Sequence, residues 1–187
     1  MVEKINEQAI GCVETSSVVA GIRAADAMLK AARVRLLFSS PVCPGKYLII
    51  TGGPVADTQA AVSAGKTEAR DSLVDEIVIP NVHPQVLEAF SATTVPAGIA
   101  ALGVIETFSL AAAIIAGDQA VKSARVDLLE IRLARALGGK GYVLLTGEVS
   151  AVRAAVEAGQ RAARDHGLLL ATTVIPAPHP DLVAKLL

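Results

Sequence analysis

Two cysteines, Cys12 and Cys43, carry the thiols of this 187-residue chain, which could bind a soft metal ion or be oxidised. Cys43 lies in the segment SSPVCPGKY, where Pro44 limits the freedom of the loop and Gly45 allows a close approach of the backbone. Cys12 lies in an apolar stretch and is expected to be a core residue. A thiolate is a good metal ligand, but a lone loop cysteine is by itself more often a free thiol.

The other polar motifs favour structural roles over catalysis. Gly45-Lys46 and Gly139-Lys140 lack the serine or threonine and the spacing of a phosphate-binding loop. His83 and His179 each precede a proline where a helix is expected to start, which favours helix capping over metal binding. The sequence shows no nucleophile triad, paired-carboxylate site or multi-ligand zinc motif, so we expect no enzyme activity.

A long internal repeat organises the chain. The segments that begin at Ala9 and at Ala101 share 15 identities over 29 positions at a shift of 92. The repeat unit of roughly 90 residues has the size of a small domain. Glu14 and Glu106 occupy equivalent positions, and this duplication favours a structural role for both.

The repeat predicts the domain boundaries. We expect a first domain over residues 1–91, a linker over residues 92–98 and a second domain over residues 99–187. The linker assignment rests on its threonines and proline.

The composition favours a protein that associates with other chains. Apolar residues make up 52% of the sequence, aromatic residues 3%, and the net charge is −1. Two small domains cannot bury this much apolar surface alone. The absence of a basic stripe argues against nucleic-acid binding, and the apolar stretches are too short to cross a membrane. We expect a soluble, cytoplasmic protein without an export signal and therefore without a disulfide.

Each repeat predicts the order β-α-β-β-α-β followed by a short helix. The expected strands are Ala9–Val13, Val34–Phe38, Tyr47–Thr51, Leu73–Ile79, Leu102–Ile105, Val126–Ile131, Tyr142–Thr146 and Leu168–Val174. The expected helices are Val55–Ala69, Ser109–Ser123, Val149–Arg164, one capped by Thr15, Ser16 or Ser17, and short ones after His83 and His179. A loop is expected over Ser39–Lys46. This order predicts an α+β fold of two ferredoxin-like domains, each a four-stranded antiparallel sheet with helices on one face.

Motifs of the second repeat resemble a known family. The segment ALGVIETFSLAAAIIAGDQAVKSARV is followed by GGK, by TGEVSAVRAAVEAG and by VIPAPHP. Together they resemble the BMC domain of bacterial microcompartment shell proteins, and the resemblance covers both repeats, from about Gln8 to Leu187. Tandem members of this family form trimers that mimic the hexamers of single-domain members. The resemblance therefore implies a homotrimeric pseudohexamer in the usual, non-permuted element order.

The CPGKY segment narrows the resemblance to the propanediol-utilisation type of tandem shell protein. That type is known for a [4Fe–4S] cluster at the centre of the trimer, and the resemblance implies Cys43 as the ligand from each subunit. The pore loops would be formed by Val42, Pro44, Gly45 and Lys46, and by Leu137, Gly138, Gly139 and Lys140. The second of these loops, within ARALGGK, has no cysteine.

The resemblance also implies contacts at the tile edge. Lys30 and Lys122 occupy the positions of a rim lysine that pairs with neighbouring tiles, although each is also a cation favoured at a helix C-terminus. The arginine of the family's Pro-Arg-Pro-His motif is missing from Pro176–His179 and from Pro80–His83. This departure puts the strength of sheet assembly in doubt.

These observations favour a microcompartment shell protein with an electron-transferring [4Fe–4S] cluster. Its partners would be other shell proteins and an encapsulated or cytosolic redox protein. One alternative keeps the trimer but has an open metabolite pore and no cluster, with Cys43 as a free thiol. Another is a soluble enzyme or regulatory protein on a duplicated ferredoxin-like scaffold, which rests on fold analogy alone.

Overall fold

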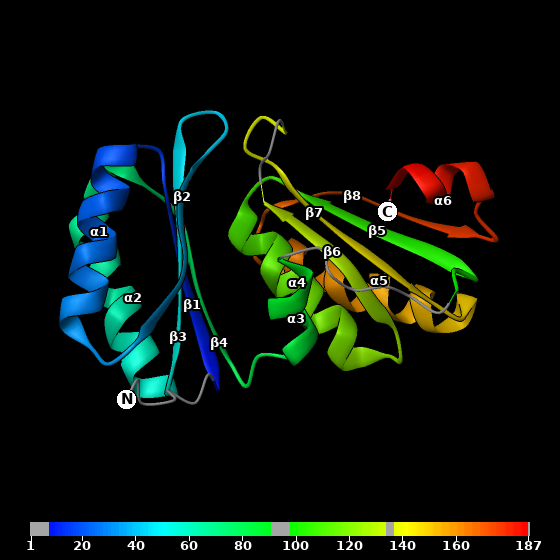
Figure 1. Cartoon of the computed structure of the whole chain (residues 1–187), viewed down its shortest axis with the longest axis horizontal. Helices are drawn as coiled ribbons and strands as arrows, with labels where there is room; N and C mark the ends of the chain where they lie inside the picture. Colours follow the sequence, from blue (N-terminus) through cyan, green and yellow to red (C-terminus); the bar gives the residue numbers. More distant parts are fainter. Residues whose placement is uncertain (1–7, 91–97, 134–136, 187) are drawn as a thin grey trace. The chain divides into compact units, whose positions relative to one another are not determined.

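The computed structural model of the chain describes residues 8–90, 98–133 and 137–186. Two four-stranded antiparallel sheets form the framework of two compact units (Figure 1). The expected α+β fold of two ferredoxin-like domains is confirmed. Among the described residues, no helix is both long and apolar enough to span a membrane.

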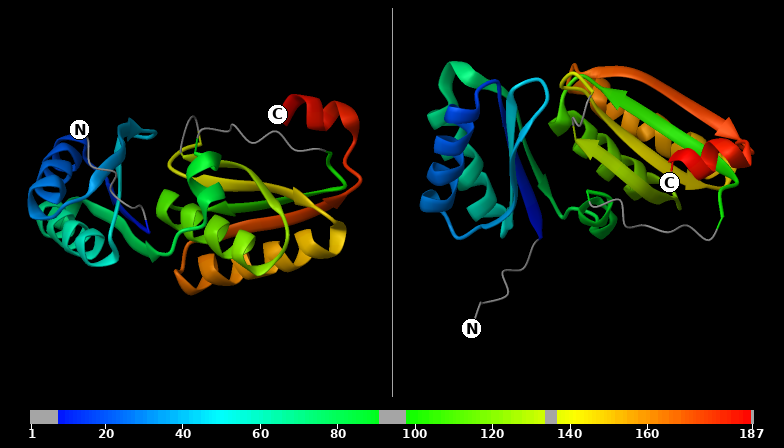
Figure 2. Two further views of the ribbon diagram at one scale, coloured as in Figure 1. Left: turned by 60° about the horizontal axis from the view of Figure 1, so that its bottom comes forward. Right: turned by 45° about the horizontal axis from the view of Figure 1, so that its top comes forward.

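The first sheet has the strand order β2-β3-β1-β4, and its two long helices cover one face (Figures 1 and 2). Its elements are β1 (Ala9–Thr15), α1 (Val18–Ala31), β2 (Arg35–Val42), β3 (Lys46–Gly53), α2 (Val55–Ala69), a short 3-10 helix (Arg70–Ser72) and β4 (Leu73–Pro80). The central strand β1 is buried at every residue. This explains its nearly continuous apolar sequence, which lacks the alternation of a half-exposed strand.

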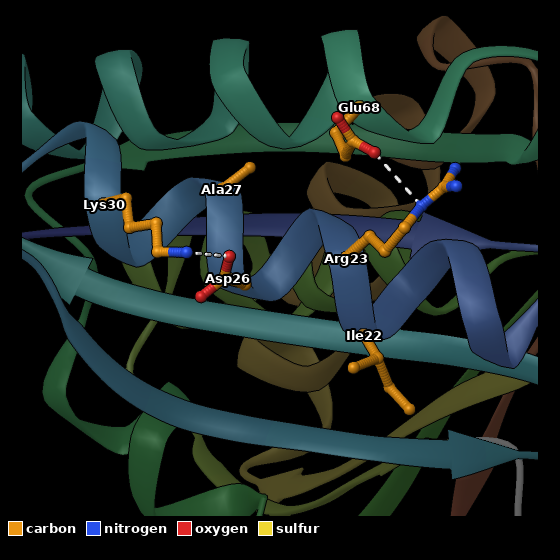
Figure 3. Close-up of a pocket in the computed structure, with 6 residues that line it drawn as sticks. All are labelled: Ile22, Arg23, Asp26, Ala27, Lys30 and Glu68. Atoms are coloured by element: carbon orange, nitrogen blue, oxygen red, sulfur yellow. Dashed lines mark hydrogen bonds and ion pairs between the residues drawn. The ribbon is translucent and has the colours of Figure 1, made fainter.

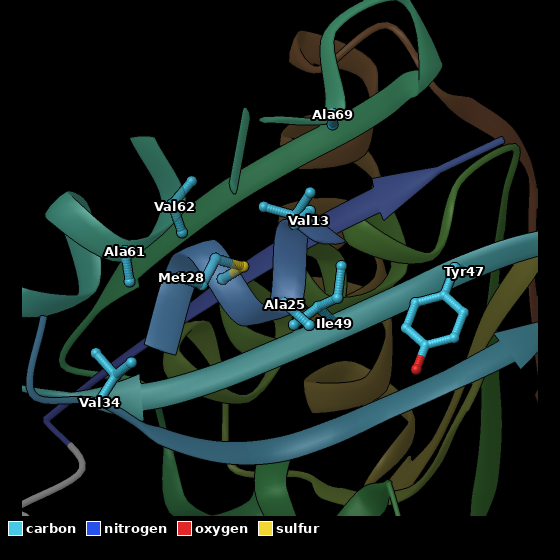
Figure 4. Close-up of a cluster of buried hydrophobic side chains, with 10 residues drawn as sticks. Val13, Ala25, Met28, Val34, Tyr47, Ile49, Ala61, Val62 and Ala69 are labelled. Carbon is cyan, nitrogen blue, oxygen red and sulfur yellow. The ribbon is translucent and has the colours of Figure 1, made fainter. Parts of the chain in front are cut away.

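The core of the first unit is built mainly from small and branched apolar side chains, with Met28 and Tyr47 as its larger members (Figure 4). Ser17 caps α1 by accepting a hydrogen bond from the Ala20 amide at 3.3 Å, as one of the three predicted caps. The buried side of α1 then places Ala24 and Met28 against the sheet. Alanines let the helix pack closely on the sheet without bulky side chains.

The second sheet repeats the order as β6-β7-β5-β8. Its elements are β5 (Ala101–Thr107), α4 (Leu110–Ser123), β6 (Asp127–Leu133), β7 (Gly141–Gly147), α5 (Val149–Asp165), β8 (Leu169–Pro176) and α6 (Pro180–Leu186). The short helix α3 (Pro84–Ala89) follows β4 in the chain but belongs to this second compact unit, where it contacts α4 and β6.

The hairpin that joins β2 to β3 is shorter than expected. The predicted loop Ser39–Lys46 is wrong in length, because β2 continues to Val42 and β3 begins at Lys46. Strand β2 lies at the sheet edge, where Pro41 is tolerated because no second neighbour needs its missing amide. The boundary at residue 91 stays a prediction, and the expected linker lies outside the described residues except for Gly98.

Helix packing within the two units depends on equivalent glycines, which gives a matched test. A Cβ atom at Gly159 would lie 2.7 Å from the backbone oxygen of Ala116 and 2.5 Å from Ile105, whereas one at Gly65 would lie 2.7 Å from Cγ and 2.8 Å from Sδ of the unbranched Met28 side chain. We expect Gly159→Ala to lower the free energy of unfolding by about 2 kcal/mol, since backbone cannot move aside as a side chain can. Gly65→Ala should stay within about 1 kcal/mol of the original, because better helix propensity offsets the crowding. Urea unfolding of both variants checks this, and equal costs would contradict it.

Candidate functional site

The Cys43 site is the tip of the hairpin that joins β2 to β3. Strand pairing runs up to Val42 opposite Lys46, so the tip contains only the three residues Cys43–Gly45. The Gly45 amide donates to the Val42 carbonyl at 3.1 Å, and its φ of +88° is one that glycine adopts readily. Cys43 is exposed at this tip. A short, closed turn therefore presents the thiol to the surroundings.

An ion pair holds the base of this hairpin. Lys46 Nζ lies 2.7 Å from Glu14 Oε1, and the side chains of Lys46 and Glu14 are 18% and 0% exposed. Glu14 pairs in register with Leu48, so Lys46 lies diagonally across the neighbouring strand on the same face. The same pairing recurs between Lys140 and Glu106, also at 2.7 Å, with 39% and 35% exposure.

Sequence reasoning did not identify these pairs as partners. It noted Glu14 and Glu106 as duplicated and treated the lysines only as loop residues. The repeat itself could have identified them. A glutamate and a lysine that recur together in both repeats are candidates for a contact that each repeat makes within itself. The expected structural role of the two glutamates is confirmed.

The second hairpin differs from the first at its tip. Residues 134–136 lie outside the described residues, and Leu137 to Lys140 complete the turn, with φ of +62° at Gly138 and +88° at Gly139. Lys46 Nζ also donates to the Gly139 carbonyl at 3.3 Å, and both residues belong to the first compact unit. This tip offers backbone groups and no thiol.

Cys12 cannot share the role of Cys43. It is fully buried in β1, in register with Ile50 on one side and Ile77 on the other. Burial, and then the nearby carboxylates of Glu14 and Asp75, raise the pKa of the Cys12 thiol well above its ordinary value. The thiol stays protonated and apolar, and the predicted core role is confirmed.

The part of the chain that the structure describes contains no group of three or more His, Cys, Asp or Glu that could hold a metal ion. His83 Nδ1 accepts from the Gln85 amide at 3.4 Å, and His179 Nδ1 accepts from the Asp181 amide at 3.2 Å. Both histidines therefore cap short helices, as predicted. Among the described residues, an iron–sulfur cluster at Cys43 would need further ligands from other chains.

The two predicted edge lysines lie in equivalent ion pairs. Lys30 Nζ is 2.5 Å from Asp26 in α1, and Lys122 Nζ is 2.6 Å from Asp118 in α4. A shallow depression beside Lys30 is lined by residues of α1 and α2, which are Ile22, Arg23, Asp26, Ala27, Lys30 and Glu68 (Figure 3). The role of Lys30 and Lys122 at a tile edge stays a prediction.

Comparison with known proteins identifies the family. The family model for the BMC domain matches residues 9–82 and 101–178. The shell protein PduT of Citrobacter freundii is 44% identical over 175 residues, which are 94% of this chain and 95% of that protein. The shell protein EutM of Salmonella typhimurium is 45% identical over 82 residues, or 44% of this chain and 83% of EutM.

A solved structure agrees with the family assignment. A microcompartment protein from Desulfitobacterium hafniense DCB matches with a TM-score of 0.85 and 52% identity, over 94% of this chain and 98% of that one. Together with the two matched segments, this confirms the tandem arrangement and the place of the protein in a microcompartment shell. The chain belongs to the BMC-domain family and is a tandem-domain shell protein of bacterial microcompartments.

Proposed function

We propose that three copies of this chain form one shell tile in which the Cys43 hairpins meet and hold a [4Fe–4S] cluster. The observation that carries the proposal is the position of Cys43, an exposed thiol at the tip of a three-residue turn whose base is held by the Lys46–Glu14 ion pair. In a tile with threefold symmetry, each chain supplies one Cys43 thiol, which gives three ligands around the axis.

The residues present fit such a group. Cys43 is the one cysteine of the chain outside the core, since Cys12 is buried and its thiol pKa is raised. Thiolates are the usual ligands of iron–sulfur clusters, and no atom lies within 4 Å of the place where a Cβ atom of Gly45 would be. When bound, the cluster supplies one-electron transfer, which would connect redox proteins on the two sides of the shell.

A second candidate function keeps the three-copy tile but uses its centre as a pore for small metabolites. The observation that favours it is the second hairpin, whose tip presents Gly138 and Gly139 and no metal ligand. In this case Cys43 is a free thiol at the rim. Both candidates have other shell proteins as partners, and only the first requires a redox partner.

Iron, acid-labile sulfide and native mass, measured on protein purified and reconstituted without oxygen, distinguish these functions. The proposal predicts about 57 kDa, three times the chain mass of 19.1 kDa, with about four irons per three chains. Particles of this mass without iron would support the metabolite pore. A monodisperse monomer or dimer would contradict both and favour a soluble regulatory protein or enzyme on the duplicated scaffold.

A further inference from the structure

Lys46 joins three parts of the first compact unit at one point. Its Nζ atom lies 2.7 Å from Glu14 Oε1 in β1 and donates to the carbonyl oxygen of Gly139 at 3.3 Å. Lys46 is also the residue at which β3 begins, directly after the Cys43–Gly45 turn. Its side chain is 18% exposed. A largely buried cation is therefore held beside this turn by a carboxylate and by a backbone oxygen.

Gly139 packs directly on the turn that carries Cys43. A Cβ atom added at Gly139 would lie 3.0 Å from Cδ of Pro44, 3.1 Å from Cε of Lys46 and 3.2 Å from its Nζ. Pro44 follows Cys43 in the chain, so the neighbour of the thiol and the ammonium of Lys46 border the same point. Gly139 is buried there and belongs, like the turn, to the first compact unit. The turn is thus supported from outside its own hairpin.

Gly138 shows that this contact belongs to only one of two adjacent glycines. It is exposed, and nothing lies within 4 Å of the place where its Cβ atom would be. Both glycines have a positive φ, +62° at Gly138 and +88° at Gly139, which explains why each is a glycine. The absence of a side chain at Gly139 has a second effect, because it leaves room for Pro44 and Lys46.

The two equivalent ion pairs differ in burial in the same way as the two turns differ in chemistry. Lys46 and Glu14 are 18% and 0% exposed, whereas Lys140 and Glu106 are 39% and 35% exposed. The turn that leads into Lys46 carries a cysteine, and the residues that lead into Lys140 do not. The buried pair therefore lies beside the exposed thiol, which indicates a role connected with that thiol.

We propose that Lys46 and Gly139 are positioning residues for the cluster held by Cys43. Gly139 fixes the place of Pro44 and so the direction of the Cys43 side chain, and Lys46 sets a positive charge beside the ligand. Groups around the ligands orient them, and net charge and hydrogen bonding set the reduction potential of a cluster. The inference rests on the proposed [4Fe–4S] site and names the residues of the chain that hold and adjust it.

Removal of the two charges in turn tests the electrostatic effect. We expect Lys46→Gln to lower the midpoint potential of the bound cluster and Glu14→Gln to raise it, because a nearby positive charge favours the reduced, more negative cluster. Loosening of the hairpin alone would shift both variants in the same direction. Lys46→Arg keeps the cation and should restore the potential of the original protein. Shifts of equal sign, or none, in the two glutamine variants would overturn the inference.

A measurement on cluster-free protein makes the test independent of iron. Cys43 is exposed and Cys12 is fully buried, so alkylation of the folded protein followed by mass spectrometry reports on Cys43. Iodoacetate is an anion and iodoacetamide is neutral, and both react with the thiolate, so the ratio of their rates reports the local charge. In low salt we expect Lys46→Gln to lower this ratio roughly threefold. Lys140→Gln removes an equal charge from the second hairpin and should leave the ratio unchanged.

Two alanine variants test the packing of Gly139 on the turn. Gly139→Ala and Gly138→Ala place the same side chain at a positive φ, but only the first meets Pro44 and Lys46. We expect Gly139→Ala to release iron to a chelator about tenfold faster than the original protein, with a changed EPR spectrum of the cluster. Gly138→Ala should keep the original rate and spectrum. Equal behaviour of the two variants would overturn the role of Gly139.

The outcomes separate this inference from the proposed function. A cluster in the original protein, with equal iron release from the two alanine variants and an unchanged alkylation ratio in Lys46→Gln, would overturn the inference and leave the cluster standing. An original protein that binds no iron after reconstitution would overturn both, even if the alkylation ratio places the charge of Lys46 beside a free thiol.

Discussion

Replacing Cys43 with serine should abolish iron and acid-labile sulfide in protein reconstituted without oxygen, while the native mass stays that of three chains. The side chain of Cys43 is exposed at a hairpin tip, so its loss removes a ligand and no core contact. A hydroxyl is a poor ligand for a cluster whose usual ligands are thiolates. Iron and sulfide analysis, with visible absorption, checks the loss, and light scattering checks the mass.

Cys12→Ala is the matched control for this experiment. It also removes one thiol per chain, but from a fully buried position in β1 where a raised pKa keeps the sulfur protonated. We expect this variant to retain the full iron content. Retention of the cluster in Cys43→Ser, or its loss only in Cys12→Ala, would contradict the assignment of Cys43 as the ligand.

Glu14→Ala should be strongly destabilising, with a loss of about 3 kcal/mol in the free energy of unfolding. The substitution removes a fully buried carboxylate and leaves the largely buried Lys46 ammonium without its charge partner. The equivalent change, Glu106→Ala, should cost less than about 1 kcal/mol, because both Glu106 and Lys140 are more than a third exposed and water screens them.

The urea midpoints of the two variants test this difference. A loss of about 3 kcal/mol lowers the midpoint by about 1.5 M when the slope is near 2 kcal/mol per M. Glu14→Gln keeps a hydrogen-bond acceptor without the charge and should fall between the original protein and Glu14→Ala. Equal midpoints for Glu14→Ala and Glu106→Ala would show that burial does not set the strength of these pairs.

The sequence predicted the elements and the core well because both rest on local patterns. Ser17 caps α1, Cys12 is buried, and both duplicated histidines cap helices, as residue type and spacing indicate. The error in the hairpin also has a local cause. Pro41 and the serines before it favour a loop, and only the position of β2 at the sheet edge makes a strand possible there.

The packing of the repeats could not be predicted from local patterns. Ile22 and Ile114 are identical residues in aligned segments, yet one is 55% exposed and the other is fully buried. Helix α3 is only six residues long, and its sequence gives no sign that it packs on the unit after it rather than on the sheet that it leaves. Both facts depend on which neighbour covers a surface, and a pattern within one repeat does not contain the neighbour.

The Lys46–Glu14 pair has a consequence for how such a shell could acquire new chemistry. The pair lies at the base of the hairpin. The three residues of the tip are all exposed, so they contribute no buried side chain to the fold. A second hairpin, held by Lys140 and Glu106, touches the first through the Lys46–Gly139 hydrogen bond, so Lys46 should be kept when the tip is changed. The residue at the tip can therefore be exchanged, for example a thiol for a histidine or a carboxylate, without changing the rest of the fold.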